Sequence, residues 1–168
     1  EPVIRKAAGL GESPTLPDPD RYAQRYAHCD VLVAGAGPAG LAAALTASAD
    51  ASQRVMVADE QTQLGGSLLD EPRATIDGQP ARAWLDAAIA TLRSRPNVTL
   101  LPRTNVFGYF PHNLIGLNER VSEHLPAAAE DMPRERLWQV RAGQVVIATG
   151  SIERPLVFGN NDLPGVML

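Results

Sequence analysis

Apolar and polar positions in the first third of the chain follow the order strand, helix, strand. Residues 29–34 form an apolar run interrupted only by Asp30, and residues 54–58 form a second short apolar run. An alanine-rich segment that starts at Pro38 separates them and has the composition of a helix. This alternation is typical of a parallel strand–helix–strand unit.

The helical and strand patterns continue beyond residue 80. Residues 81–95 have apolar residues at helical spacing and stop before Pro96, which predicts a helix, and residues 98–101 predict a third strand. The apolar stripe of this helix consists of Trp84, Leu85, Ala88, Ile89 and Leu92. We expect Trp84 to lie in the core rather than to stack on a cofactor.

Between Thr104 and Val140 the pattern changes to short segments of β character. Polar turns and a loop over 126–133 separate the segments, which predicts a small antiparallel excursion. The segments are 106–110, 114–117 and 136–140. The main sheet resumes at 144–148 and ends in Thr149 and Gly150. The predicted fold is therefore α/β, with a parallel sheet and an inserted antiparallel excursion.

The turn between the first strand and the first helix carries a Gly-x-Gly-x-x-Gly motif. Gly35 permits a tight turn, Gly37 lets the backbone approach a pyrophosphate, and Gly40 lets the helix pack closely. Pro38 suits a first helical turn, which needs no donor from it, and Ala39 follows in the same turn. The unpaired amides of such a helix start bind anions. The motif predicts a dinucleotide site; the alternative is a purely structural loop.

Two adjacent acids follow the second predicted strand. Asp59 stands near the offset of about 20 residues expected for an acid that binds ribose. A carboxylate accepts hydrogen bonds from ribose hydroxyls and repels a 2′-phosphate, which favours NAD or FAD over NADP. We favour Asp59 over Glu60 because Val55, Val57 and Asp59 share one face of a strand. Glu60 is either a second ribose ligand or a solvated loop acid.

Composition narrows the functional classes. The 168 residues, 45% hydrophobic, suffice for one core, and the net charge of −4 comes from interspersed acids and bases, which argues against nucleic acid or an anionic membrane as partner. The single cysteine, Cys29, fits a reducing compartment and excludes the cysteine pair of disulfide reductases. Since the sequence has no apolar span or secretion signal, we expect a cytoplasmic protein.

The chain offers few groups for catalysis. His28, His112 and His124 are scattered and share no metal-ligand spacing. We therefore predict no catalytic residue and no metal site in this segment, and assign any chemistry to a cofactor or a partner.

The domain boundaries follow from these patterns. We expect an N-terminal arm over 1–28, a dinucleotide-binding domain over 29–150, and a tail over 151–168 that leads into a missing second half. Because the sequence starts at Glu1 and not at Met, we expect a processed product or a piece of a longer protein.

The order of motifs resembles the first half of the two-dinucleotide-binding flavoproteins, which have a Rossmann-like, glutathione-reductase-like FAD/NAD(P)-binding fold. The resemblance covers 29–150 and rests on the glycine turn, the acids, the pair Gly65 and Gly66, the excursion, and the strand end Ala148-Thr149-Gly150. In that superfamily this strand end lies close to the cofactor, which implies Thr149 and Gly150 as binding residues.

A narrower resemblance is to the α subunits of heterotetrameric bacterial sarcosine oxidases. It extends over almost the whole chain and rests on residues 1–10, 59–61, 64–69, 101–109, 148–158 and 161–168. The resemblance implies an NAD-binding module whose partners are the β, γ and δ subunits. It also implies FAD in the β subunit, FMN at the α/β interface, and tetrahydrofolate as co-substrate.

The same resemblance implies positions for the cofactor. Asp59, Glu60 and Gln61 would surround the adenosine ribose, Ser67, beside Gly66, would lie near the phosphates, and the Val106 backbone would contact the adenine. Two alternatives stay open, since Val106 fits an ordinary strand position and Ser67 fits a helix cap.

Two further expectations concern function. The rival of the NAD-binding module is the FAD-binding domain of an amine or opine dehydrogenase-type flavoenzyme, because FAD and NAD share their adenosine diphosphate half. The segment by itself is expected to be inactive and to bind nucleotide weakly or not at all, because its crevice would be completed by the missing half.

Overall fold

A computed structural model of the chain describes Gly9 and residues 15–127, 129, 131–151, 157–161 and 163–164. The remaining positions of the predicted arm and tail lie outside the described residues. The elements in chain order are β1 (Tyr22–Ala34), α2 (Pro38–Ala47), β2 (Val55–Ala58), the 3₁₀ helix η1 (Gly66–Leu69), β3 (Thr75–Ile76), β4 (Gln79–Pro80), α3 (Ala81–Ser94), β5 (Val98–Leu101), β6 (Thr104–Phe110), β7 (Leu114–Arg120) and β8 (Glu135–Ile147).

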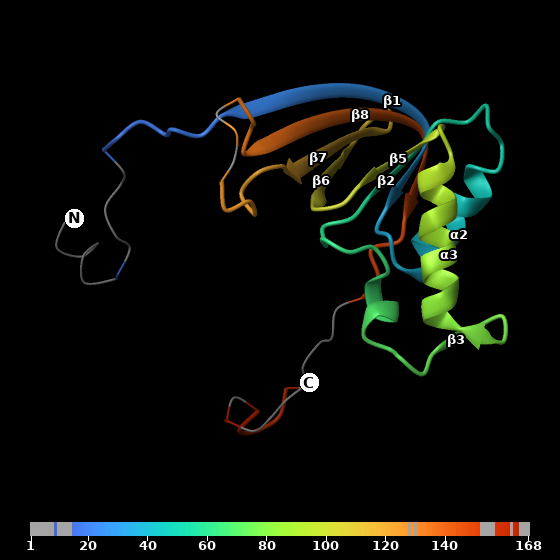
Figure 1. The fold of residues 1–168 in the computed structure, drawn as a ribbon. Helices are drawn as coiled ribbons and strands as arrows, with labels where there is room; N and C mark the ends of the chain where they lie inside the picture. The colour runs from blue at the N-terminus through green and yellow to red at the C-terminus, as the bar shows by residue number, and fades with distance from the viewer. Residues whose placement is uncertain are drawn as a thin grey trace.

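Six strands form one sheet in the order β5-β2-β1-β8-β7-β6. Strands β5, β2, β1 and β8 run parallel, whereas β7 pairs antiparallel with both β8 and β6. Figure 1 shows β1 and β8 as two long curved strands side by side, with α2 and α3 gathered at one end of the molecule. The parallel sheet with an antiparallel excursion is confirmed.

Two strand boundaries differ from the sequence prediction. Strand β1 begins at Tyr22 and not at Cys29, and β8 is continuous where the pattern suggested two segments. Residues 22–29 pair with 135–142, which lie more than a hundred positions away. Because this pairing is long-range and most of residues 22–28 are exposed, the local pattern carries no signal for it. Residues 22–28 therefore belong to the sheet and not to an arm.

Both long strands change the face to which their side chains point near Asp30 and Gly143. Cys29 and Leu32 contact the same core cluster, although a regular strand would place them on opposite faces. A Cβ on Gly143 would lie 2.9 Å from the backbone oxygen of Asp30, so the close approach of β8 to β1 at this point requires glycine. The Asp30 carboxylate accepts a hydrogen bond from Arg54 N at 2.7 Å. This bond connects β1, at the residue where its side chains change face, to the residue before β2.

The sheet carries a core on each face. On the helical face, Leu41 of α2 and Leu85 and Leu92 of α3 pack against β1 and β2, and Trp84 packs against this cluster as the helical stripe predicts. On the opposite face the parallel strands pack against the excursion. The largest buried residues of this second core are Leu32, Met56, Leu101, Ile115, Leu117 and Val140. The two cores hold the carboxyl ends of β1, β2 and β8 in place, which is where a ligand binds in such sheets.

Asn97 closes the carboxyl end of α2 and the loop that follows it. Its Nδ2 lies 2.8 Å from the carbonyl oxygen of Gln53, 3.2 Å from that of Asp50 and 3.3 Å from that of Ser48. We expect Asn97→Ala to lower the free energy of unfolding by about 2 kcal/mol, measured by urea denaturation, because these carbonyls lose their donor. Ser94→Ala is the control, with an expected change within about 0.5 kcal/mol because Ser94 is exposed. Equal losses would contradict this role.

Candidate dinucleotide-binding site

A cavity of about 580 Å³ opens at the carboxyl ends of β1, β2 and β8, in front of the first turn of α2. It brings together all the predicted cofactor-binding residues except Gly40, which is buried in α2. The predicted residues that line it are Gly35, Gly37, Pro38, Ala39, Asp59, Glu60, Gln61, Gly66, Ser67, Val106, Thr149 and Gly150. Whether each contacts a ligand stays a prediction.

Six further lining residues were not predicted. They are Ala34, Ala58, Thr104, Asn105, Ala148 and Ser151. Each is a direct chain neighbour of a predicted residue or of another residue in this set. Their position next to predicted residues in the sequence could therefore have identified them, because the strand ends that carry the motifs also expose neighbouring residues to the cavity.

The three motif glycines meet different constraints. Gly35 has a φ of +98°, and a Cβ there would overlap the backbone oxygen of Ala148. A Cβ on Gly40 would overlap the backbone oxygen of Gly35. At Gly37 the nearest atom to such a Cβ is the Cα of Gly66, 3.9 Å away. The chain itself thus requires glycine at the first and third positions, whereas Gly37 leaves open space in front of the helix.

The first turn of α2 has backbone donors that no side chain in the described part of the structure uses. Its N-cap is Gly37, which makes no capping hydrogen bond, Pro38 follows directly, and the first turn holds no acid. The leading amides of a helix have no partner within the helix, and the partial positive charge at this end attracts anions. Together with the open space at Gly37, these amides provide what binding a diphosphate requires.

The Asp59 carboxylate connects two backbone segments of the site. Its Oδ2 accepts a hydrogen bond from Ala36 N at 2.6 Å and its Oδ1 accepts one from Gln61 N at 2.8 Å, and the residue is 9% exposed. Glu60 is exposed, and its carboxylate makes no hydrogen bond or ion pair within the described part of the chain. Of the two acids, Glu60 is therefore the one whose carboxylate has no partner among the described residues, and which acid meets a ribose stays a prediction.

The physical reason for this difference lies in the end of β2. Asp59 would share the face of Val55 and Val57 only if the strand alternation continued to position 59. Strand β2 ends at Ala58, and both acids follow it in a bend. Beyond a strand end, hydrogen bonds and not alternation decide where a side chain points.

In the second glycine pair, Gly65 and Gly66, Gly66 lines the cavity and Gly65 is buried beside it. Gly65 N donates a hydrogen bond to Ala36 O at 2.9 Å, and a Cβ on Gly66 would lie 2.9 Å from the Cα of Gly37. Ser67 lies inside η1, whose N-cap is Gly65 and lacks a side-chain capping bond. The alternative of Ser67 as a helix cap is therefore wrong, and its exposed side chain is free to meet a ligand in the cavity.

Val106 lies in a strand and also lines the cavity, so its contact with an adenine stays a prediction. It pairs with Leu117 as an ordinary residue of β6, and its side chain packs against the core cluster under the excursion. It also lines the cavity beside Asn105. A strand residue with one face in the core still presents backbone atoms along the cavity, so the two interpretations are compatible.

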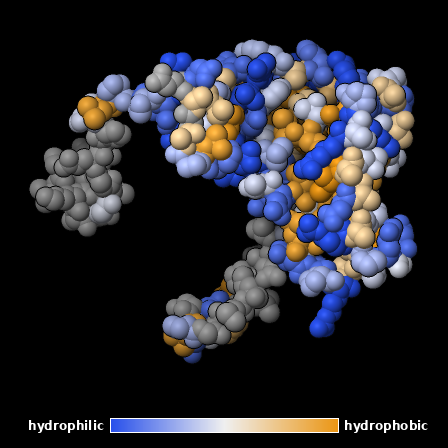
Figure 2. Space-filling view, viewed as in Figure 1, coloured by the Kyte–Doolittle hydropathy of each residue, from blue (hydrophilic) through white to orange (hydrophobic). Residues whose placement is uncertain are grey.

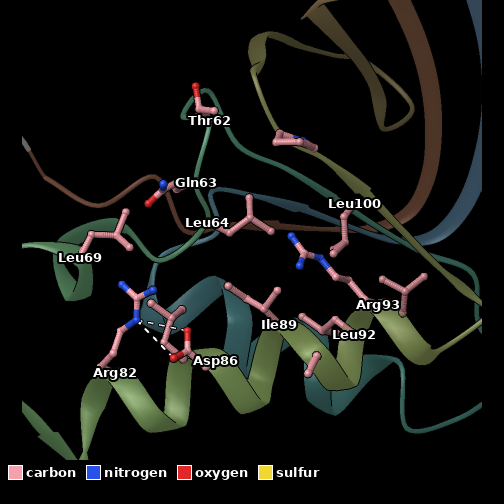
Figure 3. A pocket seen from close by; sticks show the side chains of 14 residues that line it. Thr62, Gln63, Leu64, Leu69, Arg82, Asp86, Ile89, Leu92, Arg93 and Leu100 are labelled. Atoms are coloured by element: carbon pink, nitrogen blue, oxygen red, sulfur yellow. Dashed lines mark hydrogen bonds and ion pairs between the residues drawn. The ribbon is translucent and has the colours of Figure 1, made fainter.

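A larger hollow of about 730 Å³ lies between α3, β5 and the loop of residues 62–64 (Figure 3). Leu69, Ile89 and Leu100 line it, and Arg82 pairs with Asp86 at its rim, with 3.2 Å between Nε and Oδ1. Figure 2 shows apolar surface gathered beside α3 where this groove runs. The hollow contains neither the glycine turn nor the acids, so its size alone does not make it the nucleotide site.

The part of the chain that the structure describes adds two negative findings. It contains no helix of sufficient length and apolar character to cross a bilayer. It also contains no group of three or more His, Cys, Asp or Glu side chains arranged to hold a metal ion.

Cys29 is buried in β1, and this burial raises the pKa of its thiol to about 11. A thiol of this kind is protonated and inert near neutral pH. We expect iodoacetamide to leave Cys29 unmodified in the folded chain at pH 8 and to modify it fully in urea, measured by mass spectrometry. Rapid modification of the folded chain would show that the thiol is accessible and reactive.

Comparisons with known proteins agree with the fold and the site. Residues 29–167 match the family model of the pyridine nucleotide-disulphide oxidoreductases. The chain is 53% identical, over its whole length, to the sarcosine oxidase alpha subunit of Rhizobium meliloti and 49% identical, over 95% of its length, to that of Corynebacterium sp. (strain P-1). It spans only 17% and 16% of these relatives.

A solved structure supports the architecture independently. The L-proline dehydrogenase from P. horikoshii superposes with a TM-score of 0.66 and 25% identity, over 84% of this chain and 26% of that one. The resemblance to sarcosine oxidase α subunits is thus confirmed in sequence, and the dinucleotide-binding fold is confirmed in structure. The chain belongs to the pyridine nucleotide-disulphide oxidoreductase family.

Proposed function

We propose that this chain is the NAD-binding module of the α subunit of a cytoplasmic heterotetrameric sarcosine oxidase. Such an enzyme demethylates sarcosine to glycine with O2 and tetrahydrofolate, giving H2O2 and methylenetetrahydrofolate. The β, γ and δ subunits are the partners, FAD and FMN belong to the whole complex, and this segment holds the dinucleotide without being catalytic. Identities of 46% to 53% with α subunits support the assignment.

The observation that carries the proposal is the pairing of an uncapped helix start with a free acid across one cavity. The amide of Ala39 would bind the pyrophosphate where Gly37 leaves space, and Glu60 would accept hydrogen bonds from the adenosine ribose. In the same proposal Ser67 lies near the phosphates and Val106 meets the adenine through its backbone. These contacts fit the adenosine diphosphate half of the ligand.

Other contacts are assigned more coarsely. Gln61 lies beside the ribose with Glu60, and Asp59 holds both in place through its bonds to Ala36 and Gln61. Thr149 and Gly150 close the cavity at the end of β8 and would face the part of the ligand beyond the pyrophosphate. A bound NAD supplies hydride-transfer chemistry in general, but this module contributes no reacting group of its own.

The second candidate is the FAD-binding domain of an amine or opine dehydrogenase-type flavoenzyme. The chain is 34% identical, over 76% of its length, to an opine oxidase subunit of Rhizobium meliloti. Its fold matches a proline dehydrogenase at 25% identity. Because FAD and NAD share their adenosine diphosphate half, the glycine turn and Glu60 serve both cofactors equally.

The two candidates differ in the ligand that the complete α subunit retains. The experiment is to purify that subunit without partners, record its visible absorption, and identify by mass spectrometry what it releases on denaturation. We expect a subunit without flavin absorption that releases NAD. A yellow subunit that releases FAD would replace the proposal with the second candidate.

The isolated 168-residue segment is expected to bind NAD more weakly than the complete subunit. The chain spans about a sixth of the sarcosine oxidase alpha subunits that it matches, and in the described residues the cavity is walled only by the elements named above. Titration calorimetry of both proteins with NAD measures the difference, expected to exceed about tenfold in Kd because a half-built site buries less of the ligand. Equal affinities would show that the segment contains the whole site.

A further inference from the structure

The antiparallel excursion holds the backbone of the acid loop, residues 59–61, at three consecutive carbonyls. The hydrogen bonds run from Thr104 N to Asp59 O at 2.7 Å, from Arg120 Nη2 to Glu60 O at 2.8 Å, and from Arg103 N to Gln61 O at 3.0 Å. The Asp59 carboxylate in turn accepts from Ala36 N and Gln61 N. The free carboxylate of Glu60 therefore belongs to a segment whose backbone is held by the excursion and by the bonds of Asp59 to Ala36 and Gln61.

Arg120 is the one side chain among these three donors to the loop carbonyls. It is the last residue of β7, and its backbone N donates to Arg103 O at 3.0 Å. Arg103 has a φ of +53°, in the left-handed region that L-residues rarely adopt, and bonds at both its N–H and its C=O hold it there. The end of β7 and the turn before β6 are thus bonded to each other and together hold the acid loop; we call Arg103, Thr104 and Arg120 the frame of this loop.

Two roles are conceivable for an arginine at this place. A small polar cavity of about 260 Å³ next to the proposed ribose position is lined by Arg120 with Glu60, Gln61, Asn105 and Asn118. An arginine in such a cavity resembles a receptor for the 2′-phosphate of NADP. The alternative is that Arg120 contacts no ligand and only holds Glu60.

The geometry favours the second role. The Nη2 of Arg120 is bonded to the Glu60 carbonyl, and its Nε lies 3.5 Å from an oxygen of Glu123, so the guanidinium already has partners on two sides. The unpaired Glu60 carboxylate borders the same cavity and would repel a phosphate. Both observations oppose phosphate binding and agree with a structural use of the side chain.

We infer that Arg120 is a positioning residue that fixes Glu60 for the adenosine ribose through the Glu60 carbonyl, without touching the ligand. This inference rests on the proposed function, because it deepens the description of the same site. It assigns the excursion a role in binding: β7 supplies the bond that sets the place of an acid that follows β2.

The test compares Arg120→Met, which keeps an unbranched apolar stem, with Arg82→Met as a matched control on α3. In the complete subunit we expect Arg120→Met to raise the Kd for NAD about fivefold, the effect of one hydrogen bond, and the control to change it less than about twofold. In a Glu60→Ala background, Arg120→Met is expected to have almost no further effect, because it acts through Glu60.

Three results would overturn the inference: an unchanged Kd in Arg120→Met, a full fivefold loss that persists without Glu60, or a loss seen with NADP and not with NAD. If the wild-type subunit binds no dinucleotide, the proposed function fails, and a ligand-free measurement decides the positioning role separately. Hydrogen exchange of the Gln61 amide should then be faster in Arg120→Met than in wild type or Arg82→Met. Unchanged exchange would refute the claim that Arg120 holds the acid loop in place.

Discussion

Gly40→Ala is expected to lower the free energy of unfolding by about 3 kcal/mol, because its Cβ would overlap the backbone oxygen of Gly35. No flexible side chain is available to move aside, since the opposing atom belongs to the glycine turn itself. The Cβ would also lie 3.3 Å from the Cβ of Ala148, so α2 would have to retreat from β8. Urea denaturation measures the loss.

Gly37→Ala is the matched variant in the same motif. Gly37 has a φ of −71°, which alanine adopts freely, and the nearest atom to an added Cβ lies 3.9 Å away. We expect its stability to stay within about 0.5 kcal/mol of wild type, while the Kd for NAD rises more than about tenfold because the methyl group fills the approach of the pyrophosphate. Similar losses of stability in both variants would contradict this division of roles.

The second large effect concerns the two adjacent acids. Asp59→Asn is expected to lower the free energy of unfolding by about 2 kcal/mol, because an asparagine side chain has one oxygen for the two amides of Ala36 and Gln61. One buried N–H would then face an NH2 group. The change is measured by urea denaturation at neutral pH.

Glu60→Gln is the control for Asp59→Asn, and it tests the ribose assignment. Glu60 is exposed and its carboxylate has no partner among the described residues, so we expect its stability to stay within about 0.5 kcal/mol of wild type. The Kd for NAD should rise about tenfold, since a charged acceptor to the ribose hydroxyls is lost. A stability loss at Glu60 with no change at Asp59 would reverse the two assignments.

Most of the architecture could be predicted because its signals are local. The stripe of α3, the apolar runs of β2 and β5, and the glycine spacing before α2 each lie within a short window, and each is observed. Close steric demands also leave a mark in the sequence: Gly35 and Gly40 are glycines because the backbone oxygens of Ala148 and Gly35 occupy the space of a Cβ.

The features that the sequence did not predict depend on contacts between distant segments. The first half of β1 is held by pairing with residues 135–142, and its exposed residues show no alternation that would reveal the strand. The orientation of Asp59 depends on the amide of Ala36, and the frame around Glu60 depends on Arg120 at the end of β7. Such hydrogen bonds form only once the sheet has brought these segments together.

The most direct test of the account is a crystal structure of the complete α subunit, purified and crystallised without added nucleotide. We expect density for NAD across the first turn of α2, with its diphosphate within hydrogen-bond distance of the Ala39 amide and its adenosine ribose at the Glu60 carboxylate. An empty glycine turn, or a nucleotide seated instead in the groove beside α3, would contradict it.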